Sequence, residues 1–351
     1  MKKKSTNARK KIHNKLLKHL KNPKINKIYK IFQKNLEIAS LNNSFVAAVS
    51  GGPDSLALAY FLKCFSIIRK VDVFFYHVDH RLRKESSKEA KLIKKELNKF
   101  DINCKIIIWR GKKPLSNIQS EARKKRYELI ANKCSQDNVK YILTAHHIDD
   151  LYENFFIRVL RGSGLEGLVS FNSFKKNYNN DLILLRPMIN VSKNELVYIA
   201  KNVFNFSIND PSNKNIVYKR ARIRKLIEEL KTEGLDFKKL ILTINNLSYS
   251  NNSINYIVHN NLKINVKAIN KNTQFILSEN FFKNPSEIVF RSMGKILKKM
   301  SKKYYPPRGK SVVNLIESIQ EQKFKKMTLY GCVIEKVNNS VIIYKEFKKI
   351  S

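Results

Sequence analysis

One short segment constrains the fold of this chain more than any other. Five apolar residues, Phe45–Val49, are followed after one serine by two adjacent glycines, and apolar residues at helical spacing follow at Leu56, Ala59 and Leu62. An apolar run of this length that ends in a glycine turn predicts a buried strand, and the spacing after it predicts a helix. The segment therefore predicts a strand–loop–helix unit of the kind found in parallel sheets.

The alternation of strands and helices continues to about residue 203. Further strands are expected at Val71–His77, Cys104–Trp109, Tyr141–Ala145 and Leu182–Leu185. Helices are expected at residues 86–99, 117–136, 148–161 and 192–203, the last opened by a capping box of Ser192 and Glu195. This order predicts an α/β fold, a doubly wound parallel sheet with helices on both faces.

The pattern changes after residue 230, which indicates a division into domains. Residues 1–25 are rich in Lys and Asn and predict a basic N-terminal arm, either mobile or a frayed helix. Residues 26–230 carry the strand–helix alternation. Residues 235–351 contain short alternating segments such as Ser340–Tyr344 and predict a smaller α+β domain.

The charge of the chain is extreme, with 69 Lys and Arg against 28 Asp and Glu and a net charge of +41. A field of this sign attracts polyanions, so RNA or DNA is the expected partner. The alternative is a general drift of composition, because Lys is abundant together with Asn and Ile. Drift alone would also enrich Glu, and acidic residues are scarce here.

Cysteine usage and hydropathy limit the compartment and the class of protein. The four cysteines lie far apart and form no CxxC pair, so buried free thiols are expected rather than a zinc site or a disulfide framework. No apolar run approaches the ~20 residues of a membrane span, and no apolar core follows the basic start. A cytoplasmic location and no membrane partner are expected.

The glycine turn itself predicts an anion site. Glycines let the backbone approach an anion closely, and the N-terminus of the following helix presents unpaired N–H groups to it. The lysine of a GxxxxGK[ST] loop is absent, as is GxGxxG. An ordinary strand-to-helix turn capped by Asp54 or Ser55 is the alternative.

A second cluster joins two histidines to three acids. His146 and His147 precede Asp149, Asp150 and Glu153 at the expected start of a helix. On a helical wheel the core face comprises Tyr152, Phe155, Phe156, Val159 and Leu160, and the opposite face comprises Asp150, Glu153, Asn154 and Arg161. The acids either stabilise the helix N-terminus or form an amine- or metal-binding pocket.

A third signal is a pair of arginines on the helix expected at 117–136. Arg123 and Arg126 align with Tyr127, Ile130 and Cys134 on the side that is predicted to be buried. An inward arginine needs an anionic partner. That partner is either a structural carboxylate, or a phosphate or carboxylate of a substrate.

These motifs resemble one enzyme family. The loop at 50–55 resembles the phosphate loop of PP-loop ATP pyrophosphatases. Six further motifs follow the order seen in the tRNA(Ile)-lysidine synthetases of that superfamily: ARKKRY (122–127), HHIDDLYEN (146–154), RVLRGSGLEGL (158–168), Arg186-Pro187, DPSN (210–213) and RARIR (220–224). The resemblance is strong over residues 44–230 and weaker beyond, where TLYGC (328–332) looks like the last strand motif of the family. Leu151, Asn154 and Ala221 depart from the usual pattern and affect fine pocket contacts.

The resemblance implies a ligase that uses ATP and Mg²⁺ to join free L-lysine to C2 of the wobble cytidine in a CAU-anticodon tRNA(Ile). An adenylated cytidine is the implied intermediate, and lysidine, AMP and pyrophosphate are the products. The implied ATP contacts are Ser50, Gly51, Gly52, Pro53, Asp54 and Ser55. Asp54 is the expected Mg²⁺ contact. The sequence leaves the oligomeric state open, a homodimer included.

Roles in the implied reaction follow residue by residue. Asp150 and Glu153 are expected at the lysine ammonium by charge pairing. Arg123 is expected at a phosphate or a carboxylate, and His147 acts either as a general base or as a phosphate contact. His146 is given a core position.

The expected tRNA contacts lie in two places, with the carboxyl-terminal domain as a further recognition element. They are Arg158 and Arg161 beside the hinge at 162–164, and Arg220, Arg222 and Arg224. A solvated basic helix face is the alternative for the last three.

Two other functions compete. A tRNA thiolase of the same superfamily needs sulfur-handling cysteines, usually paired. A non-catalytic basic RNA-binding protein explains the charge but gives no purpose to the loop, to the acidic cluster or to the inward arginines.

Overall fold

The computed structural model describes residues 6–39, 43–172, 175–177, 182–208, 219–269, 273–303, 306–321 and 323–346. The chain forms two compact units, Met1–Ile244 and Asn245–Ser351. The division falls about ten residues after the start of the smaller domain expected from the sequence.

A six-stranded sheet forms the centre of the first unit. Its strand order is β3-β2-β1-β4-β6-β5. The strands are β1 (Phe45–Ala48), β2 (Val73–Asp79), β3 (Cys104–Ile108), β4 (Tyr141–Leu143), β5 (Lys175–Asn177) and β6 (Ile183–Leu185). All neighbours pair in parallel except β5, which lies antiparallel to β6 at the edge. The five strands expected from the sequence are confirmed as β1, β2, β3, β4 and β6.

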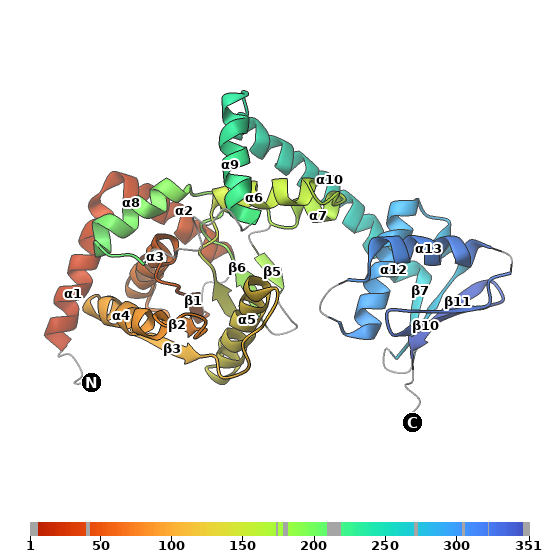
Figure 1. Ribbon diagram of the computed structural model, residues 1–351, viewed down its shortest axis with the longest axis horizontal. Coiled ribbons are helices and arrows are strands. Elements are labelled where there is room, and N and C mark those ends of the chain that lie inside the picture. The colour runs from red at the N-terminus through yellow and green to blue at the C-terminus, as the bar shows by residue number, and fades with distance from the viewer. Residues whose placement is uncertain are drawn as a thin grey trace. The chain divides into compact units, whose positions relative to one another are not determined.

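Helices cover both faces of this sheet, as the doubly wound fold requires (Figure 1). Because side chains alternate along a strand, Phe45 and Ala47 of β1 enter one core while Val46 enters the other. The first core is covered by α3 (Pro53–Arg69), α4 (Ser86–Lys99) and α8 (Lys193–Phe204), and the second by α5 (Ile118–Gln136). Ser192 and Glu195 form the expected capping box of α8: the Ser192 hydroxyl accepts from the Glu195 N–H at 3.3 Å, and the Ser192 N–H donates to the carboxylate at 2.8 Å.

The N-terminal region is helical from Thr6 onwards. It forms α1 (Thr6–Lys18), the 3₁₀ turn η1 (His19–Lys21) and α2 (Pro23–Ala39). Leu16 of α1 and Phe32 of α2 are fully buried in the first core. The described part of residues 1–25 is a packed helix, so both alternatives expected from the sequence, a mobile arm and a frayed helix, are wrong for it.

A separate group of helices packs beside the sheet. It comprises α6 (Ile148–Val159), α7 (Leu165–Val169), α9 (Lys219–Thr232) and the first turns of α10 (Phe237–Asn265). Tyr152, Phe155 and Phe156 pack here, as predicted for the core face of α6. The prediction is wrong for Val159 and Leu160, which are 47% and 59% exposed, because the helix ends there and its last turn extends past the core.

The second unit is an antiparallel sheet with helices, in order β7-β8-β11-β10-β9. Its strands are β7 (Val266–Ile269), β8 (Gln274–Leu277), β9 (Lys326–Leu329), β10 (Cys332–Val337) and β11 (Ser340–Lys345). Its helices are α11 (Glu279–Phe282), α12 (Ser286–Ser301) and α13 (Gly309–Gln320). Tyr330 and Gly331 join β9 to β10, both with positive φ (61° and 80°), which is the geometry of a tight hairpin turn. None of the described helices is both long and apolar enough to span a membrane.

Candidate active site

The phosphate loop lies between β1 and α3, and its backbone is held by one hydroxyl group. Ser55 Oγ accepts hydrogen bonds from the N–H groups of Ser50 and Gly51, both at 3.1 Å, and donates to the carbonyl of Gly52 at 2.9 Å. Gly51 has a φ of +90°, and a Cβ there would lie 2.6 Å from Cδ1 of Ile93. A glycine is therefore required for both the backbone angle and the space.

The start of α3 supplies anion-binding groups. Gly52 is the N-cap, Pro53 occupies the first helical position, and the first helical hydrogen bond runs from the Leu56 N–H to the Gly52 carbonyl at 3.0 Å. The N–H groups of Asp54 and Ser55 precede that bond, so the helix itself leaves them available to a phosphate. The loop has the form expected of a phosphate site.

The sheet order brings a second segment to this loop. β1 lies between β2 and β4, and the chain reaches β4 only after it has built β2 and β3 on the other side. The loops that follow β1 and β4 therefore diverge at a topological switch point, where ligands bind in open α/β sheets. The segment after β4 carries His146, His147 and the acids of α6.

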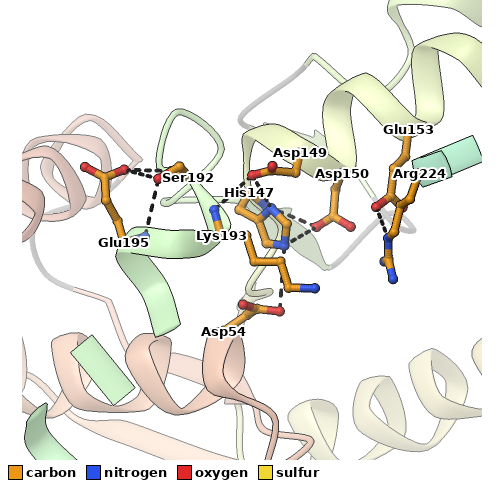
Figure 2. Close-up of polar contacts among 9 residues, drawn as sticks. All are labelled: Asp54, His147, Asp149, Asp150, Glu153, Ser192, Lys193, Glu195 and Arg224. Carbon is orange, nitrogen blue, oxygen red and sulfur yellow. Dashed lines mark hydrogen bonds and ion pairs between the residues drawn. The ribbon is translucent and has the colours of Figure 1, made fainter. Parts of the chain in front are cut away.

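His147 forms the centre of a carboxylate cluster, which Figure 2 shows. Its Nε2 lies 3.7 Å from Oδ2 of Asp54 and 3.5 Å from Oδ2 of Asp150, and its Nδ1 lies 3.4 Å from Oδ2 of Asp149. Burial lowers the pKa of His147, but the three carboxylates outweigh burial and raise this pKa to about 10. His147 is therefore an imidazolium, with no lone pair to accept a proton. Of its two expected roles, the cluster favours the phosphate contact over the general base.

The two aspartates of α6 have different surroundings. Asp149 accepts a hydrogen bond from the backbone N–H of Lys193 at 2.9 Å and so fixes the start of α8, which is a structural role. Asp150 accepts a hydrogen bond from the backbone N–H of His147 at 3.2 Å. Its carboxylate lies on the side of the cluster that faces the phosphate loop. In the view of Figure 2 the side chain of Lys193, which the sequence did not single out, runs from α8 in the direction of Asp54.

Arg123 is held by a chain of hydrogen bonds that includes His146. The guanidinium lies 3.3 Å from Nε2 of His146, and Nδ1 of the same ring lies 2.7 Å from Oγ1 of Thr144. The Thr144 hydroxyl donates in turn to the carbonyl of Leu185 at 3.3 Å. Burial and the neighbouring Arg123 keep the pKa of His146 well below its usual value, so the neutral ring accepts from Arg123 and donates to Thr144. His146, which is half-buried, is thus a positioning group at the site.

The prediction that Arg126 points inward is wrong. Arg126 is exposed and its Nε lies 3.4 Å from Nε2 of His80, which is 46 residues away in the sequence. Arg186, which the sequence placed only in a motif, is instead 4% exposed. Its NH1 donates to the carbonyl of Phe171 at 3.3 Å, and burial lowers its pKa, with Arg123 close enough to lower it further.

The side chain of Glu153 is buried, and only one of its two carboxylate oxygens has a hydrogen-bond partner. Its Oε1 accepts from Nε of Arg224 on α9 at 2.5 Å, and its Oε2 is buried without a hydrogen-bond partner. Burial lowers the pKa of Arg224, but the bond to Glu153 outweighs burial and raises it. Arg224 therefore belongs to the acidic cluster, whereas Arg220 and Arg222 are exposed. Figure 2 shows the pair beside Asp150.

The remaining tRNA residues lie at the end of α6. Arg158 is half-buried and Arg161 is exposed. Gly162 has a φ of +62°, and the N–H of Ser163 returns to the carbonyl of Arg158 at 3.0 Å, so the glycine hinge ends the helix. The DPSN motif at 210–213 lies outside the described residues.

The donor set suits a magnesium ion held mostly by phosphates. Oδ1 of Asp54 is buried without a hydrogen-bond partner beside the phosphate loop. Among the described residues no group of three or more His, Cys, Asp or Glu has the arrangement of a metal centre. Mg²⁺ is commonly bound through one or two carboxylates together with substrate phosphates, and Asp54 fits that mode.

The thiols do not support sulfur transfer. All four cysteines are free and buried. Burial raises the pKa of Cys64, Cys104 and Cys134 to about 12 and that of Cys332 to about 11, so thiolates do not form near neutral pH.

Comparisons with known proteins agree with this site. A family model described as a PP-loop domain matches residues 20–230. The chain is 33% identical over 315 residues to the tRNA(Ile)-lysidine synthase of Orientia tsutsugamushi (strain Boryong), covering 87% of this chain and 70% of the relative. It is 32% identical over 317 residues to the tRNA(Ile)-lysidine synthase of Wolbachia pipientis wMel, covering 89% and 73%. This chain belongs to the tRNA(Ile)-lysidine synthase family.

The fold of the family's PP-loop domain is also seen in a solved structure of another enzyme. The U34-tRNA thiolase NcsA from Methanococcus maripaludis, with its [4Fe-4S] cluster, aligns with a TM-score of 0.51 at 15% identity, over 60% of this chain and 74% of the thiolase. At that identity the likeness shows a shared fold. As a PP-loop enzyme of the lysidine synthase family, the chain uses ATP.

Proposed function

We propose that this chain ligates free L-lysine to C2 of the wobble cytidine in a CAU-anticodon tRNA(Ile), with ATP as the activating substrate. The observation that carries the proposal is the junction of the phosphate loop with the cluster of His147, Asp54 and Asp150, at contacts of 3.5–3.7 Å. Membership in the lysidine synthase family supports the same reaction.

In the first step the C2 oxygen of cytosine attacks the α-phosphorus of ATP. The bond from that phosphorus to the β-phosphate bridging oxygen breaks, and pyrophosphate leaves. The N–H groups at the start of α3 and the imidazolium of His147 stabilise the negative charge that develops on the phosphates. Asp54 would hold a Mg²⁺ ion together with the phosphates, and the ion would supply further charge neutralisation.

In the second step the lysine ammonium gives a proton to Asp150, the neutral ε-amine attacks C2, and the C2–O bond breaks so that AMP leaves with the oxygen. The activated oxygen makes AMP a good leaving group, which the oxygen of free cytidine is not. Asp150 and the buried, unpartnered Oε2 of Glu153 are acceptors for the lysine ammonium. Arg123, oriented by His146, is placed to bind a phosphate or the α-carboxylate of lysine.

The tRNA is held outside the reacting centre by basic groups. We assign Arg158, Arg161, Arg220 and Arg222 to phosphate-backbone contacts, and Arg224 to the pocket through Glu153. The carboxyl-terminal unit is assigned to tRNA recognition.

The test is mass analysis of an unmodified tRNA(Ile) transcript after incubation with the protein, ATP, Mg²⁺ and lysine. The added lysine is expected at the anticodon loop, together with one pyrophosphate per modified tRNA. The matched control is the same transcript with uridine at the wobble position, which should gain nothing. Binding of the tRNA without pyrophosphate release would contradict the enzyme and favour a non-catalytic RNA-binding protein.

A further inference from the structure

A regular ladder of lysines runs through the N-terminal helices. Every third residue from 15 to 30 is a lysine. The ladder consists of Lys15, Lys18, Lys21, Lys24, Lys27 and Lys30. The first acidic residue of the chain is Glu37, so no carboxylate interrupts the ladder.

The ladder lysines face solvent, while the opposite side of the same helices packs in the core. All six lysines are exposed, while Leu16, Ile25 and Ile28 on the inner side are 1% exposed in the core. Helix α1 is tied to Asp101, whose carboxylate lies 2.8 Å from Nε2 of His13, and Tyr60 donates to the carbonyl of Leu16 at 3.3 Å. In Figure 1 α1 and α2 are drawn in red at the start of the chain, beside α3 and α8. The ladder is therefore held in place before any partner arrives.

Several helical lysines elsewhere in this chain are paired with acids on their own helix. Lys99 bonds Glu96 at 2.6 Å and Lys231 bonds Glu228 at 2.6 Å. Among the described residues no acid forms an ion pair with a ladder lysine. Within each helix, ladder lysines three residues apart lie about 5–6 Å apart at Cβ, where like charges repel. Burial lowers the pKa of His19, and Lys15 and Lys18 lower it further, which is a mark of that positive field. A general drift toward lysine does not explain the density of the ladder: the acid-free stretch at 237–278 carries five lysines over 42 residues, whereas the ladder carries six over 16.

We propose that the lysine ladder binds the phosphate backbone of the tRNA as a second contact surface, apart from the active site. The identification of the RNA as a tRNA rests on the proposed function, whereas the assignment of the ladder as a phosphate-binding surface does not. Six exposed charges along α1, η1 and α2 suit a string of phosphates rather than a single anion. Helix α1 also precedes residue 20, where the PP-loop family match begins.

An anionic membrane surface is the competing partner, and the packing disfavours it. A membrane-bound basic helix needs a free apolar face. Leu16 is buried and Leu17 and Leu20 pack against the core, and no large apolar side chain of residues 6–37 is among the exposed ones. The ladder therefore presents positive charge but no apolar side chains that could insert into a membrane.

The test is the salt dependence of tRNA binding by the full chain with Lys15, Lys18, Lys27 and Lys30 changed to Gln. Each phosphate contact contributes about 0.9 to the slope of log K against log [salt]. The variant should lower the magnitude of that slope by roughly 3 to 4, raise KM for tRNA and leave kcat at saturating tRNA unchanged. Its Tm should equal or exceed that of the wild type, because like charges are removed.

The matched control changes the same number of exposed lysines on α4, Lys88, Lys91, Lys95 and Lys99, to Gln. This set carries the same charge but is interspersed with acids. A second control with the four ladder lysines changed to Arg should bind like the wild type. Equal losses in the α4 variant, an unchanged slope in the ladder variant, or binding of anionic vesicles in preference to tRNA would each overturn the proposal. A wild type that binds tRNA but forms no lysidine would contradict the proposed function, and the slope would still decide the ladder.

Discussion

Changing His147 to Gln tests the electrostatics of the site most directly. The imidazolium of His147 balances Asp54, Asp149 and Asp150, and its pKa rises from an ordinary value near 6.5 to about 10. This difference corresponds to roughly 4–5 kcal/mol of stability when the ring is protonated in both the folded and unfolded protein. The stabilisation is fully present below pH 6.5 and is lost as the pH rises through 10.

The assay is urea unfolding of wild type and His147→Gln in metal-free buffer from pH 6 to pH 9.5. Trp109 is the only tryptophan of the chain and lies in the first unit, so its fluorescence reports the unit that contains the site. The stability advantage of the wild type should fall by about 1.4 kcal/mol for each pH unit above 6.5. A difference between the two proteins that stays constant across this range would show that His147 is neutral and would refute the imidazolium.

Three further perturbations test other contacts of the site. Gly51→Ala should raise KM for ATP and destabilise the protein by about 1–3 kcal/mol because of its positive φ. Ile93→Ala should cost less stability in that variant than in the wild type, because it removes both atoms that lie within 3 Å of the new Cβ; equal costs would mean that the clash is absent. Glu153→Gln should raise KM for lysine by roughly 10- to 100-fold, measured by lysidine formation, with KM for ATP as the internal control; a change in the ATP value alone would place Glu153 elsewhere. His146→Ala should slow single-turnover lysidine formation, and adding Arg123→Ala should slow it little more; additive losses would separate the two residues.

Local patterns predicted most of the first unit. The apolar run before the glycines became β1, and the expected helices at 86–99 and 117–136 match α4 and α5 within a residue. Such elements are set by periodicity and by turn residues, which act over a few positions of the chain. The helices α7 and α9 and the edge strand β5 were not predicted, because their short or highly charged segments carry a weak pattern.

Side-chain directions were harder to predict. A helical wheel gives the angle between residues but not where the core ends. Val159 and Leu160 were therefore assigned to the core, although the last turn of α6 extends beyond it. Arg126 was assigned inward with Arg123 for the same reason. In the structure Arg123 faces the site and Arg126 does not. Arg123 is held there by its hydrogen bond to His146, which lies in the segment after β4.

The sequence by itself determined the phosphate loop, since Gly51, Gly52 and Ser55 act within six residues and their geometry depends on local angles and hydrogen bonds. It also determined the charge of the ladder. Only the tertiary structure decided that Asp54 meets His147 and that Arg224 closes on Glu153, a contact across 71 residues. The first contact depends on the strand order that sets β1 beside β4, and the second on the packing of α9 against α6; no local pattern encodes either.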